Sequence, residues 1–535
     1  MLNKLFYGDN LSVLKESIAT ESVDLIYLDP PFNSNASYNV LFSTPSGEGS
    51  QAQIEAFEDT WHWNESAERA FDEVVTGPHS DASIMLRAMR SALGENDMMA
   101  YLAMMAVRLI ELHRVLKPTG SLYLHCDPTA SHYLKLLMDG IFGASQFKNE
   151  IIWRRGTPRG HAFTRYASLH DVIFYYARGE VAIWNAESAV VKYDIEDLEV
   201  KTDEKYSLRD SDGRRYQLTS LLNPNPNRPN LTYEFLGVRR VWRWTRERMA
   251  EAYAAGLVVQ PRSGGVPRFK RYLDEQKGKP IGDMWDDIPP INSQAQERLG
   301  YPTQKPVALL ERIISASSNR GDIVLDPFCG CGTTIHAAQK LNREWIGIDI
   351  THLAIALVER RLNEAFPAIT YDVHGVPKDH AGARDLAERD KHEFQKWITA
   401  KIGAQPYKGG KKGMDRGIDG YLHFRDADKK PQFAIVSVKG GENINSAMVR
   451  DLKGTMEREN AALGLFLTLN KPTREMEREA ASAGIYETGG MKVPRLQILT
   501  AAEILNNRRP QVPFGFTEGF RKAGQEKEDR QPKLL

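Results

Sequence analysis

The chain has 535 residues, more than one hydrophobic core organises, so about two to four domains are expected. It carries 70 Lys and Arg against 70 Asp and Glu, so nucleic-acid binding cannot rest on overall charge and must come from local patches. The cysteines, Cys126, Cys329 and Cys331, are too few for a disulfide framework or a zinc quartet and fit a reducing compartment. With no signal-peptide pattern and no membrane-length apolar run, a cytoplasmic protein without membrane association is expected.

A strand, a helix and a second strand are predicted at the N-terminus. Residues 5–7 are apolar, a helix begins near Leu11, and the apolar run 25–28 indicates a buried strand. Asp9 follows the first strand. It either caps the helix or faces a ligand beyond the strand end.

The second strand ends in Asp29-Pro30-Pro31-Phe32. Proline cannot donate to a sheet ladder and restricts the residue before it, so the strand must stop here. This leaves a carboxylate, a stiff backbone and an aromatic ring at a strand end, where open α/β sheets bind ligands. A carboxylate and a carbonyl oxygen can accept both hydrogens of the exocyclic amino group of a nucleobase, and a ring can stack on a flipped base. A proline-rich turn after a core strand is the alternative.

Helices and strands continue to alternate through residues 65–177. The segment 65–117 has helical spacing, 121–126 is a buried strand, a helix follows near 131–138, and 172–176 is a further strand. This alternation predicts an α/β fold with a parallel sheet covered on both faces.

From about residue 180 to 290 the periodicity is weak, and Pro, Asn and Gly are frequent. Arginines interleave with aromatic residues, most densely in 239–246 and 268–272. This composition suits phosphate contacts and base stacking, and it predicts a nucleic-acid-binding region. A solvated strand face with arginine stems lying along it is the alternative.

Strict order returns in residues 300–350, with a helix predicted over 307–317 and a strand over 322–325. A helix over 335–341 and a strand over 345–348, ending at Asp349, follow. Between the strand over 322–325 and the helix over 335–341 lies the glycine-rich loop Asp326-Pro327-Phe328-Cys329-Gly330-Cys331-Gly332-Thr333-Thr334. Such a loop lets backbone amides approach a ligand, and an acidic residue about 20 positions later suits ribose hydroxyls. A tight turn capped by Thr333 is the alternative.

The residues that the loop does not contain reduce the number of ligand classes that it could bind. Ile335 stands where the nicotinamide fingerprint needs a third glycine, and the Gly-Lys-Ser/Thr of nucleoside-triphosphate loops is absent. The loop has no basic residue to meet a pyrophosphate. An adenosyl ligand without phosphates, S-adenosylmethionine, is therefore predicted.

The two motifs, their order and Thr303-Gln304-Lys305-Pro306 resemble the DNA amino-methyltransferases of permuted, β-type order. That resemblance covers about residues 1–370 and implies a Rossmann-like methyltransferase whose catalytic half precedes the target-recognition region and the cofactor half. It implies that Asp29 is the acceptor carboxylate, that Pro30 supplies an accepting carbonyl, and that Phe32 stacks on the base, with Pro31 completing the motif. An aspartate at the head of this motif is usual for adenine-N6 enzymes, whereas serine is commoner in cytosine-N4 enzymes. The implied cofactor-binding residues are Asp9, Thr303, Lys305, Asp326, Pro327, Phe328, Gly330, Gly332, Thr333 and Asp349.

Residues 371–390 are polar and mixed in charge, and a linker is expected there. Further on, Asp419 within Gly-Ile-Asp-Gly and a strand over 433–438 leading into Lys439 resemble the core of PD-(D/E)xK nucleases, particularly restriction endonucleases that act on modified DNA. The resemblance implies a small α/β domain in which Asp419 holds Mg²⁺, Lys439 orients the attacking water and Glu393 offers a second carboxylate. The chain departs from the pattern at Ser437, where Glu or Gln is usual, so Mg²⁺ binding and cleavage are left open.

Five parts are therefore expected: the catalytic half 1–180, the target-recognition region 181–295, the S-adenosylmethionine half 296–370, an endonuclease-like domain 385–505 and a flexible tail 506–535. The predicted function is site-specific methylation of double-stranded DNA at adenine N6, in the setting of a restriction–modification system. Cytosine-N4 methylation, Mg²⁺-dependent cleavage by the C-terminal domain, and a DNA-binding regulator with a silent site are the alternatives. A homodimer is left open.

Overall fold

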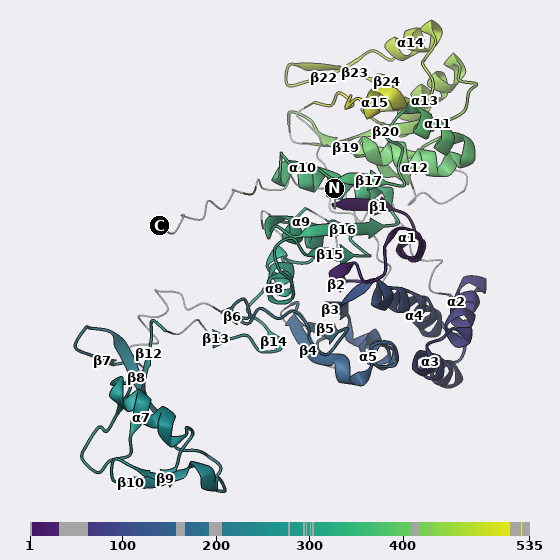
Figure 1. The fold of residues 1–535 in the computed structure, drawn as a ribbon. Helices are drawn as coiled ribbons and strands as arrows, with labels where there is room; N and C mark the ends of the chain where they lie inside the picture. The colour runs from purple at the N-terminus through teal and green to yellow at the C-terminus, as the bar shows by residue number, and fades with distance from the viewer. Residues whose placement is uncertain are drawn as a thin grey trace. The chain divides into compact units, whose positions relative to one another are not determined.

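The computed structural model describes residues 3–31, 62–156, 166–191, 206–275, 279–292, 304–407, 417–428 and 430–513, with 295, 297–299, 301 and 526. The chain divides into two compact units (Figure 1). Unit 1 contains Met1–Asn185 and Asp283–Leu535, and unit 2 is Ala186–Gly282. Unit 1 holds a large and a small α/β domain, whereas unit 2 is built mainly from short strands.

A nine-stranded sheet in the order β14-β4-β5-β3-β2-β15-β16-β1-β17 forms the centre of the large domain. Neighbouring strands are parallel, except that β5 runs antiparallel to both β3 and β4. The strands are β1 (Lys4–Tyr7), β2 (Val23–Leu28), β3 (Leu116–Cys126), β4 (Phe147–Arg154), β5 (His170–Ala177), β14 (Met284–Trp285), β15 (Ile323–Asp326), β16 (Glu344–Asp349) and β17 (Asp372–His374).

Helices cover both faces of this sheet, as predicted. Side chains of a strand alternate between the two faces of the sheet, so neighbouring residues of β3 contact the helices on opposite faces. Leu122 and Leu124 pack in the core built around α4, whereas the Tyr123 hydroxyl bonds the Ser317 hydroxyl of α8 at 2.6 Å. The helices of the large domain are α1 (Asn10–Ser17), α2 (Glu65–Thr76), α3 (Ser80–Leu93), α4 (Asp97–Val115), α5 (Pro128–Phe142), α8 (Val307–Ser317), α9 (Thr333–Lys340) and α10 (His352–Ala365).

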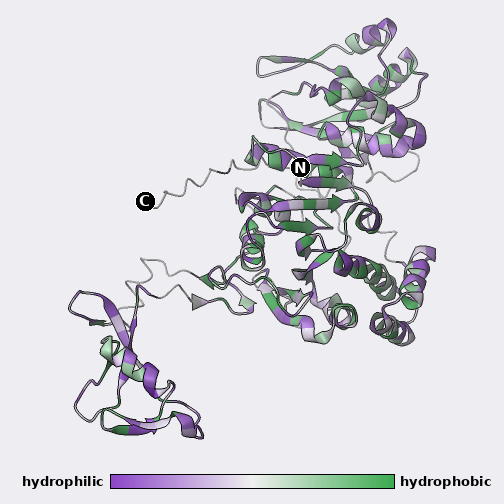
Figure 2. Cartoon of the chain, viewed as in Figure 1, coloured by the Kyte–Doolittle hydropathy of each residue, from purple (hydrophilic) through white to green (hydrophobic). Residues whose placement is uncertain are grey.

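Helix α4 buries more residues than any other helix of the large domain. Twelve of its 19 residues are buried, and Figure 2 shows hydrophobic colouring along much of its length. Asn96 caps its first turn by accepting from the Met99 N–H at 2.9 Å. A helix that is apolar nearly all round belongs in a core, so α4 fixes the catalytic half against the sheet.

Unit 2 contains a four-stranded antiparallel sheet in the order β11-β12-β8-β7 and a β9–β10 hairpin. Its core contains Tyr233, Trp242 and Met249, which gives this weakly periodic region an apolar centre of its own. Its elements are β6 (Val190–Val191), β7 (Leu208–Arg209), β8 (Arg215–Ser220), β9 (Thr232–Phe235), β10 (Val238–Val241), α7 (Arg246–Ala254), β11 (Val258–Val259), β12 (Arg268–Tyr272) and β13 (Lys279–Pro280).

The small domain of unit 1 has a five-stranded sheet in the order β18-β19-β20-β21-β24. Strands β20, β21 and β24 are parallel and buried, whereas β18 and β19 pair antiparallel. Its elements are α11 (His380–Arg389), α12 (Lys391–Lys401), β18 (Gln405–Pro406), β19 (Gly420–Arg425), β20 (Pro431–Lys439), α13 (Ser446–Arg458), β21 (Leu463–Thr468), α14 (Arg474–Ala481), β22 (Ile485–Thr488), β23 (Met491–Pro494), β24 (Leu496–Thr500) and α15 (Ala501–Leu505).

The linker predicted over 371–390 is wrong. Residues of β17 extend the large sheet by pairing with β1, and His374 stacks on Phe6 with ring centroids 4.7 Å apart. Helix α11 is capped by Asp379, which accepts from the Gly382 N–H at 2.8 Å, and it buries Leu386 and Ala387. Polar composition misled the prediction because an edge strand and a half-exposed helix need few apolar residues. Among the described residues, no helix combines the length and apolarity needed to cross a membrane.

Candidate functional site

Four carboxylates lie at the same edge of the large sheet. Strands β2, β15, β16 and β1 are neighbours and run parallel, so their carboxyl ends meet at one edge. Asp326 and Asp349 are the last residues of β15 and β16, Asp29 follows β2, and Asp9 lies two residues after β1. The early tetrapeptide and the late glycine-rich loop therefore come together, as the sequence predicted.

Asp29 forms an ion pair with Lys305 at 2.5 Å, and both side chains are mostly buried. Lys305 precedes α8, so the segment between unit 2 and the cofactor loop supplies the cation for the catalytic motif. Pro30 is buried and Pro31 half-buried after the strand end. Phe32 and Thr303 lie outside the described residues.

The glycine-rich loop turns sharply between β15 and α9. Asp326 accepts from the Phe328 N–H at 3.0 Å, and the Cys329 N–H donates to the Ile348 carbonyl at 3.0 Å. Gly330 and Gly332 have φ of 48° and 73°, and a Cβ on Gly332 would lie 2.9 Å from Val358. Helix α9 begins at Thr333 without a side-chain cap, so its first N–H groups face the loop.

Two carboxylates with raised pKa values lie at this loop. Burial raises the pKa of Asp326 to about 7, because hydrogen bonds from Thr334 and the Phe328 N–H only partly offset it and the charges of Asp29 and Asp349 add to it. Burial also raises the pKa of Asp349. Asp349 already holds the loop, since its carboxylate accepts from the Gly330 N–H and the Thr351 N–H, both at 2.9 Å. S-adenosylmethionine carries a sulfonium and an ammonium, so its charge fits this cluster.

Asp9 is both a helix cap and an ion-pair partner. One carboxylate oxygen accepts from the Ser12 N–H at 3.2 Å, and the other lies 2.6 Å from Arg108. Arg108 also donates to Asn10 at 2.6 Å, and the Asn10 amide donates to the Pro327 carbonyl at 2.9 Å. Capping and ligand binding were alternatives in the sequence. The structure contains the cap and ties Asp9 to the loop through Arg108 and Asn10.

Sequence reasoning missed two buried arginines that hold the site. Arg361 of α10 is 3% exposed, and it donates to the Cys331 carbonyl at 3.0 Å and the Thr333 hydroxyl at 3.1 Å. It falls on the apolar face of its helix with Val358 and Leu362. A charged residue at a core position of an amphipathic helix was the available signal, both here and at Arg108 of α4.

Asp419 of the small domain lies in a hydrogen-bonded corner. It is buried; one oxygen accepts from the Val438 N–H at 2.6 Å and the other from the Gln395 amide at 2.8 Å. Lys439 ends β20 next to Val438, so the predicted pair lies at one strand end.

Glu393, expected as a second carboxylate, instead contacts the large domain. It accepts from the Tyr7 hydroxyl and lies 3.4 Å from His352. No group of three metal-ligating side chains occurs in the part of the chain that the structure describes.

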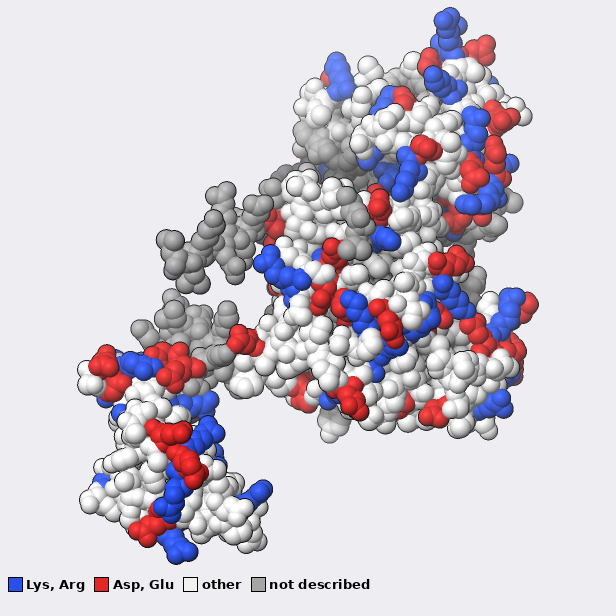
Figure 3. Space-filling model, in the orientation of Figure 1, with Lys and Arg blue, Asp and Glu red and all other residues white. Residues whose placement is uncertain are grey.

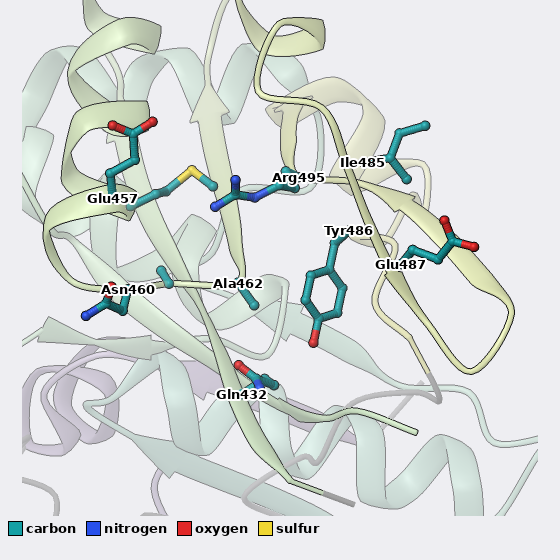
Figure 4. Close-up of a pocket in the computed structure, with 10 residues that line it drawn as sticks. Gln432, Glu457, Asn460, Ala462, Ile485, Tyr486, Glu487 and Arg495 are labelled. Atoms are coloured by element: carbon teal, nitrogen blue, oxygen red, sulfur yellow. The ribbon is translucent and has the colours of Figure 1, made fainter. Parts of the chain in front are cut away.

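A cavity of about 540 Å³ lies in the small domain, between the start of β20, the end of α13 and the β22–β23 hairpin (Figure 4). Gln432, Tyr486 and Arg495 line it. Gln432 stands at the beginning of β20 and Val438 near its end, so this cavity is separate from the Asp419 corner.

Comparisons with known proteins agree with the two α/β domains. Residues 23–360 match the N6/N4 family model described as "DNA methylase", and residues 386–488 match a model of the Mrr type described as "Restriction endonuclease". The chain therefore belongs to the N6/N4 DNA methylase family, whose members are S-adenosylmethionine-dependent DNA amino-methyltransferases, and it carries a C-terminal domain of the restriction-endonuclease type.

Relatives cover most of the methyltransferase part. The chain is 29% identical over 364 residues to the type II methyltransferase M.EcaI of Enterobacter cloacae, covering 67% of this chain and 69% of the relative. It is 26% identical over 387 residues to the DNA adenine methyltransferase YhdJ of Escherichia coli K12, covering 72% and 91%. A crystal structure of a candidate DNA modification methylase from Thermus thermophilus with S-adenosyl-L-methionine is 17% identical, covers 69% of this chain and 99% of its own, and has a TM-score of 0.33.

Proposed function

We propose that the chain methylates adenine at N6 in double-stranded DNA, with Asp29 as the residue that accepts from the amino group. One observation carries the proposal: Asp29 directly follows a strand, beside the glycine-rich loop, and is paired with Lys305 at 2.5 Å. The aspartate at the head of the motif favours adenine by its resemblance to adenine-N6 enzymes. The relative YhdJ, described as a DNA adenine methyltransferase, supports the same base.

The reaction asks three things of the chain's own residues. An exocyclic amine is a poor nucleophile, because its lone pair is delocalised into the ring. Acceptance of its hydrogens by the Asp29 carboxylate and the Pro30 carbonyl favours a more tetrahedral nitrogen. After transfer the nitrogen carries an extra proton, and Asp29 is the acceptor for it. Until Asp29 takes up this proton, Lys305 compensates its negative charge.

S-adenosylmethionine supplies an electrophilic methyl group when bound. Asp326 and the glycine-rich loop would hold its methionine side, Asp349 would accept from ribose hydroxyls, and Asp9 would approach its adenine. Lys305, Pro327, Phe328, Gly330, Gly332 and Thr333 complete the proposed cofactor residues, with Thr303. The burial of Asp326 beside Asp29 and Asp349, which raises its pKa to about 7, supports this assignment, because a nearby positive charge would favour its carboxylate form.

Unit 2 is the proposed DNA-recognition region. Residues 226–272 contain ten basic residues and three acidic ones, although the whole chain is neutral. Arg239 and Arg240 of β10 and Arg268 of β12 are exposed, and Figure 3 shows lysine and arginine side chains interleaved with acidic ones on the visible face of this unit. Arginine suits bidentate contacts with phosphates and base edges.

The C-terminal domain of the restriction-endonuclease type also supports DNA as a ligand of this protein. Magnesium is not part of this proposal, because both oxygens of Asp419 already accept hydrogen bonds from N–H groups, and Glu393, expected as its second carboxylate, contacts Tyr7 and His352 instead. No cleavage step is assigned to Asp419 and Lys439.

The test is methyl transfer followed by identification of the base. Purified protein is incubated with DNA and tritium-labelled S-adenosylmethionine, and the DNA is digested to nucleosides. Label in N6-methyldeoxyadenosine, lost in Asp29→Asn, is the expected result. Label in N4-methyldeoxycytidine would refute the choice of adenine, and absence of label with bound cofactor would refute the enzymatic assignment.

A further inference from the structure

A buried chain of polar side chains lies behind Asp29 and has no part in the reaction as described so far. The Tyr27 hydroxyl lies 2.8 Å from Nδ1 of His125, and Nε2 of His125 lies 3.1 Å from Asp171. The other oxygen of Asp171 lies 2.8 Å from Arg155. Three strands, β2, β3 and β5, contribute one residue each, and Arg155 follows directly after β4.

All three inner residues are deeply buried. His125 is 0% exposed, and Tyr27 and Asp171 are each 2% exposed. Trp153 closes the histidine off, with its ring edge-on to His125 at 5.7 Å. Burial of polar groups this deep is costly, and an apolar replacement of similar shape is often neutral or stabilising. Stability alone is therefore a weak reason for this arrangement. The position of these hydrogen-bonded side chains next to Asp29 indicates a different reason.

The hydrogen-bonded side chains of Tyr27, His125 and Asp171 lie on the face of the sheet that carries Asp29. Tyr27 and Asp29 are two residues apart in an extended segment, so their side chains point to the same face. The charges of Lys305 and Asp29 reach His125, and the charge of Lys305 reaches Asp171 as well. Lys305, which pairs with Asp29, therefore also acts on the carboxylate at the far end of the chain.

Hydrogen bonding sets one orientation for the histidine. Burial and then the nearby Lys305 lower the pKa of His125, so the ring is neutral at physiological pH. Burial alone would raise the pKa of Asp171, but the hydrogen bond from His125 and the charges of Lys305 and Arg155 lower it, so Asp171 is a carboxylate. Asp171 can only accept, so Nε2 carries the proton, Nδ1 accepts, and Tyr27 donates.

We propose that Tyr27, His125 and Asp171 are positioning residues that fix the end of β2 and thereby the direction of the Asp29 carboxylate. The proposal rests on the proposed methyl transfer. Arg155 compensates Asp171, Asp171 orients His125, and His125 holds the Tyr27 hydroxyl two residues before the catalytic carboxylate. Transfer to a weak nucleophile depends on geometry within about 1 Å, and a misplacement of that size can cost about 100-fold in rate.

Tyr27→Phe removes one hydroxyl and leaves the ring. The expected result is a kcat about 10- to 100-fold lower, with the KM for DNA and the Kd for S-adenosylmethionine within about twofold of the wild type. His125→Leu should behave in the same way, and His125→Gln, which retains a donor and an acceptor, should recover part of the lost rate. Rates are expressed per cofactor-binding molecule, so that a loss of folded protein does not count as a loss of kcat.

Tyr123→Phe is the matched control. Tyr123 is the register partner of Tyr27 on β3 and is equally buried, but its hydroxyl bonds Ser317 and is not part of the Tyr27–His125–Asp171 network. This variant should lose similar stability and keep kcat within about twofold. If Tyr27→Phe has the turnover of Tyr123→Phe, the positioning role is refuted. If His125→Leu does not fold, Tyr27→Phe decides alone. A wild type that transfers no methyl group refutes the proposed function, and with it this role, whereas an active wild type with fully active variants refutes the positioning role only.

Discussion

Replacement of Asp29 by Asn is the sharpest test of the catalytic site. Asparagine has the same shape and retains one acceptor oxygen, so the strand end and the packing against Lys305 should survive. What is lost is the negative charge that accepts from the amino group and takes its proton. General-base catalysis is typically worth 10²–10⁴-fold, so kcat should fall about 10³-fold, or about 4 kcal/mol of barrier.

Folding should suffer far less than catalysis in this variant. The Asp29–Lys305 pair is short, at 2.5 Å, and mostly buried, and a hydrogen bond between charged groups is worth about 1.5–3 kcal/mol. An amide oxygen recovers part of that value, so the free energy of unfolding should fall by about 1–2 kcal/mol. Urea unfolding measures this loss, and isothermal titration calorimetry should give a Kd for S-adenosylmethionine within about fivefold of the wild type.

The control for this experiment is Asp127→Asn. Asp127 also follows a strand of the large sheet, but it caps α5 by accepting from the Thr129 and Ala130 N–H groups. Asparagine is an equally good cap, so activity and stability should both be retained. Transfer of tritiated methyl groups within about threefold of the wild type by Asp29→Asn, with cofactor bound, would refute the role given to Asp29.

Three further predictions concern the cofactor loop and the small domain. Folded Asp326 keeps its proton up to about pH 7, whereas the unfolded chain releases it near 3.8, so the free energy of unfolding without cofactor should fall as pH rises through this window. The Kd for S-adenosylmethionine should fall from pH 6 to 8, because the carboxylate form attracts the cationic ligand. Asp326→Asn should abolish both trends in urea unfolding and calorimetry, and their persistence would contradict the assignment. Arg361→Met should raise the Kd for S-adenosylmethionine about tenfold, because the Cys331 carbonyl and the Thr333 hydroxyl lose their donor, and an unchanged Kd would show that the loop holds its shape without it. Asp419→Ala should lower the free energy of unfolding by about 3 kcal/mol with or without Mg²⁺, since the Val438 N–H and the Gln395 amide lose their acceptor, and a loss seen only with Mg²⁺ would reveal a metal site instead.

The local chemistry of the site could be predicted from the sequence because strand ends, prolines and glycines act on their immediate neighbours. The run 25–28 followed by Asp29 required a strand that stops, and the spacing from the glycine loop to Asp349 predicted the next strand end. Parallel strands then bring their carboxyl ends to one edge, so the meeting of Asp29 with Asp326 followed from a general rule of α/β folds. The linker prediction over 371–390 was wrong because composition does not indicate that a neighbouring edge strand, β1, offers unpaired backbone groups to β17.

Which distant side chains touch was decided only by the tertiary structure. Helical spacing predicted the helix that is α4, but not that Arg108 on its buried face, or Arg361 on that of α10, would hold the loops of the proposed cofactor site. His125 was one residue of an apolar strand in the sequence, and its partners come from two other strands. Period and propensity fix a residue's face within its own element, whereas strand order and helix packing, which arise from the whole core at once, fix its neighbours.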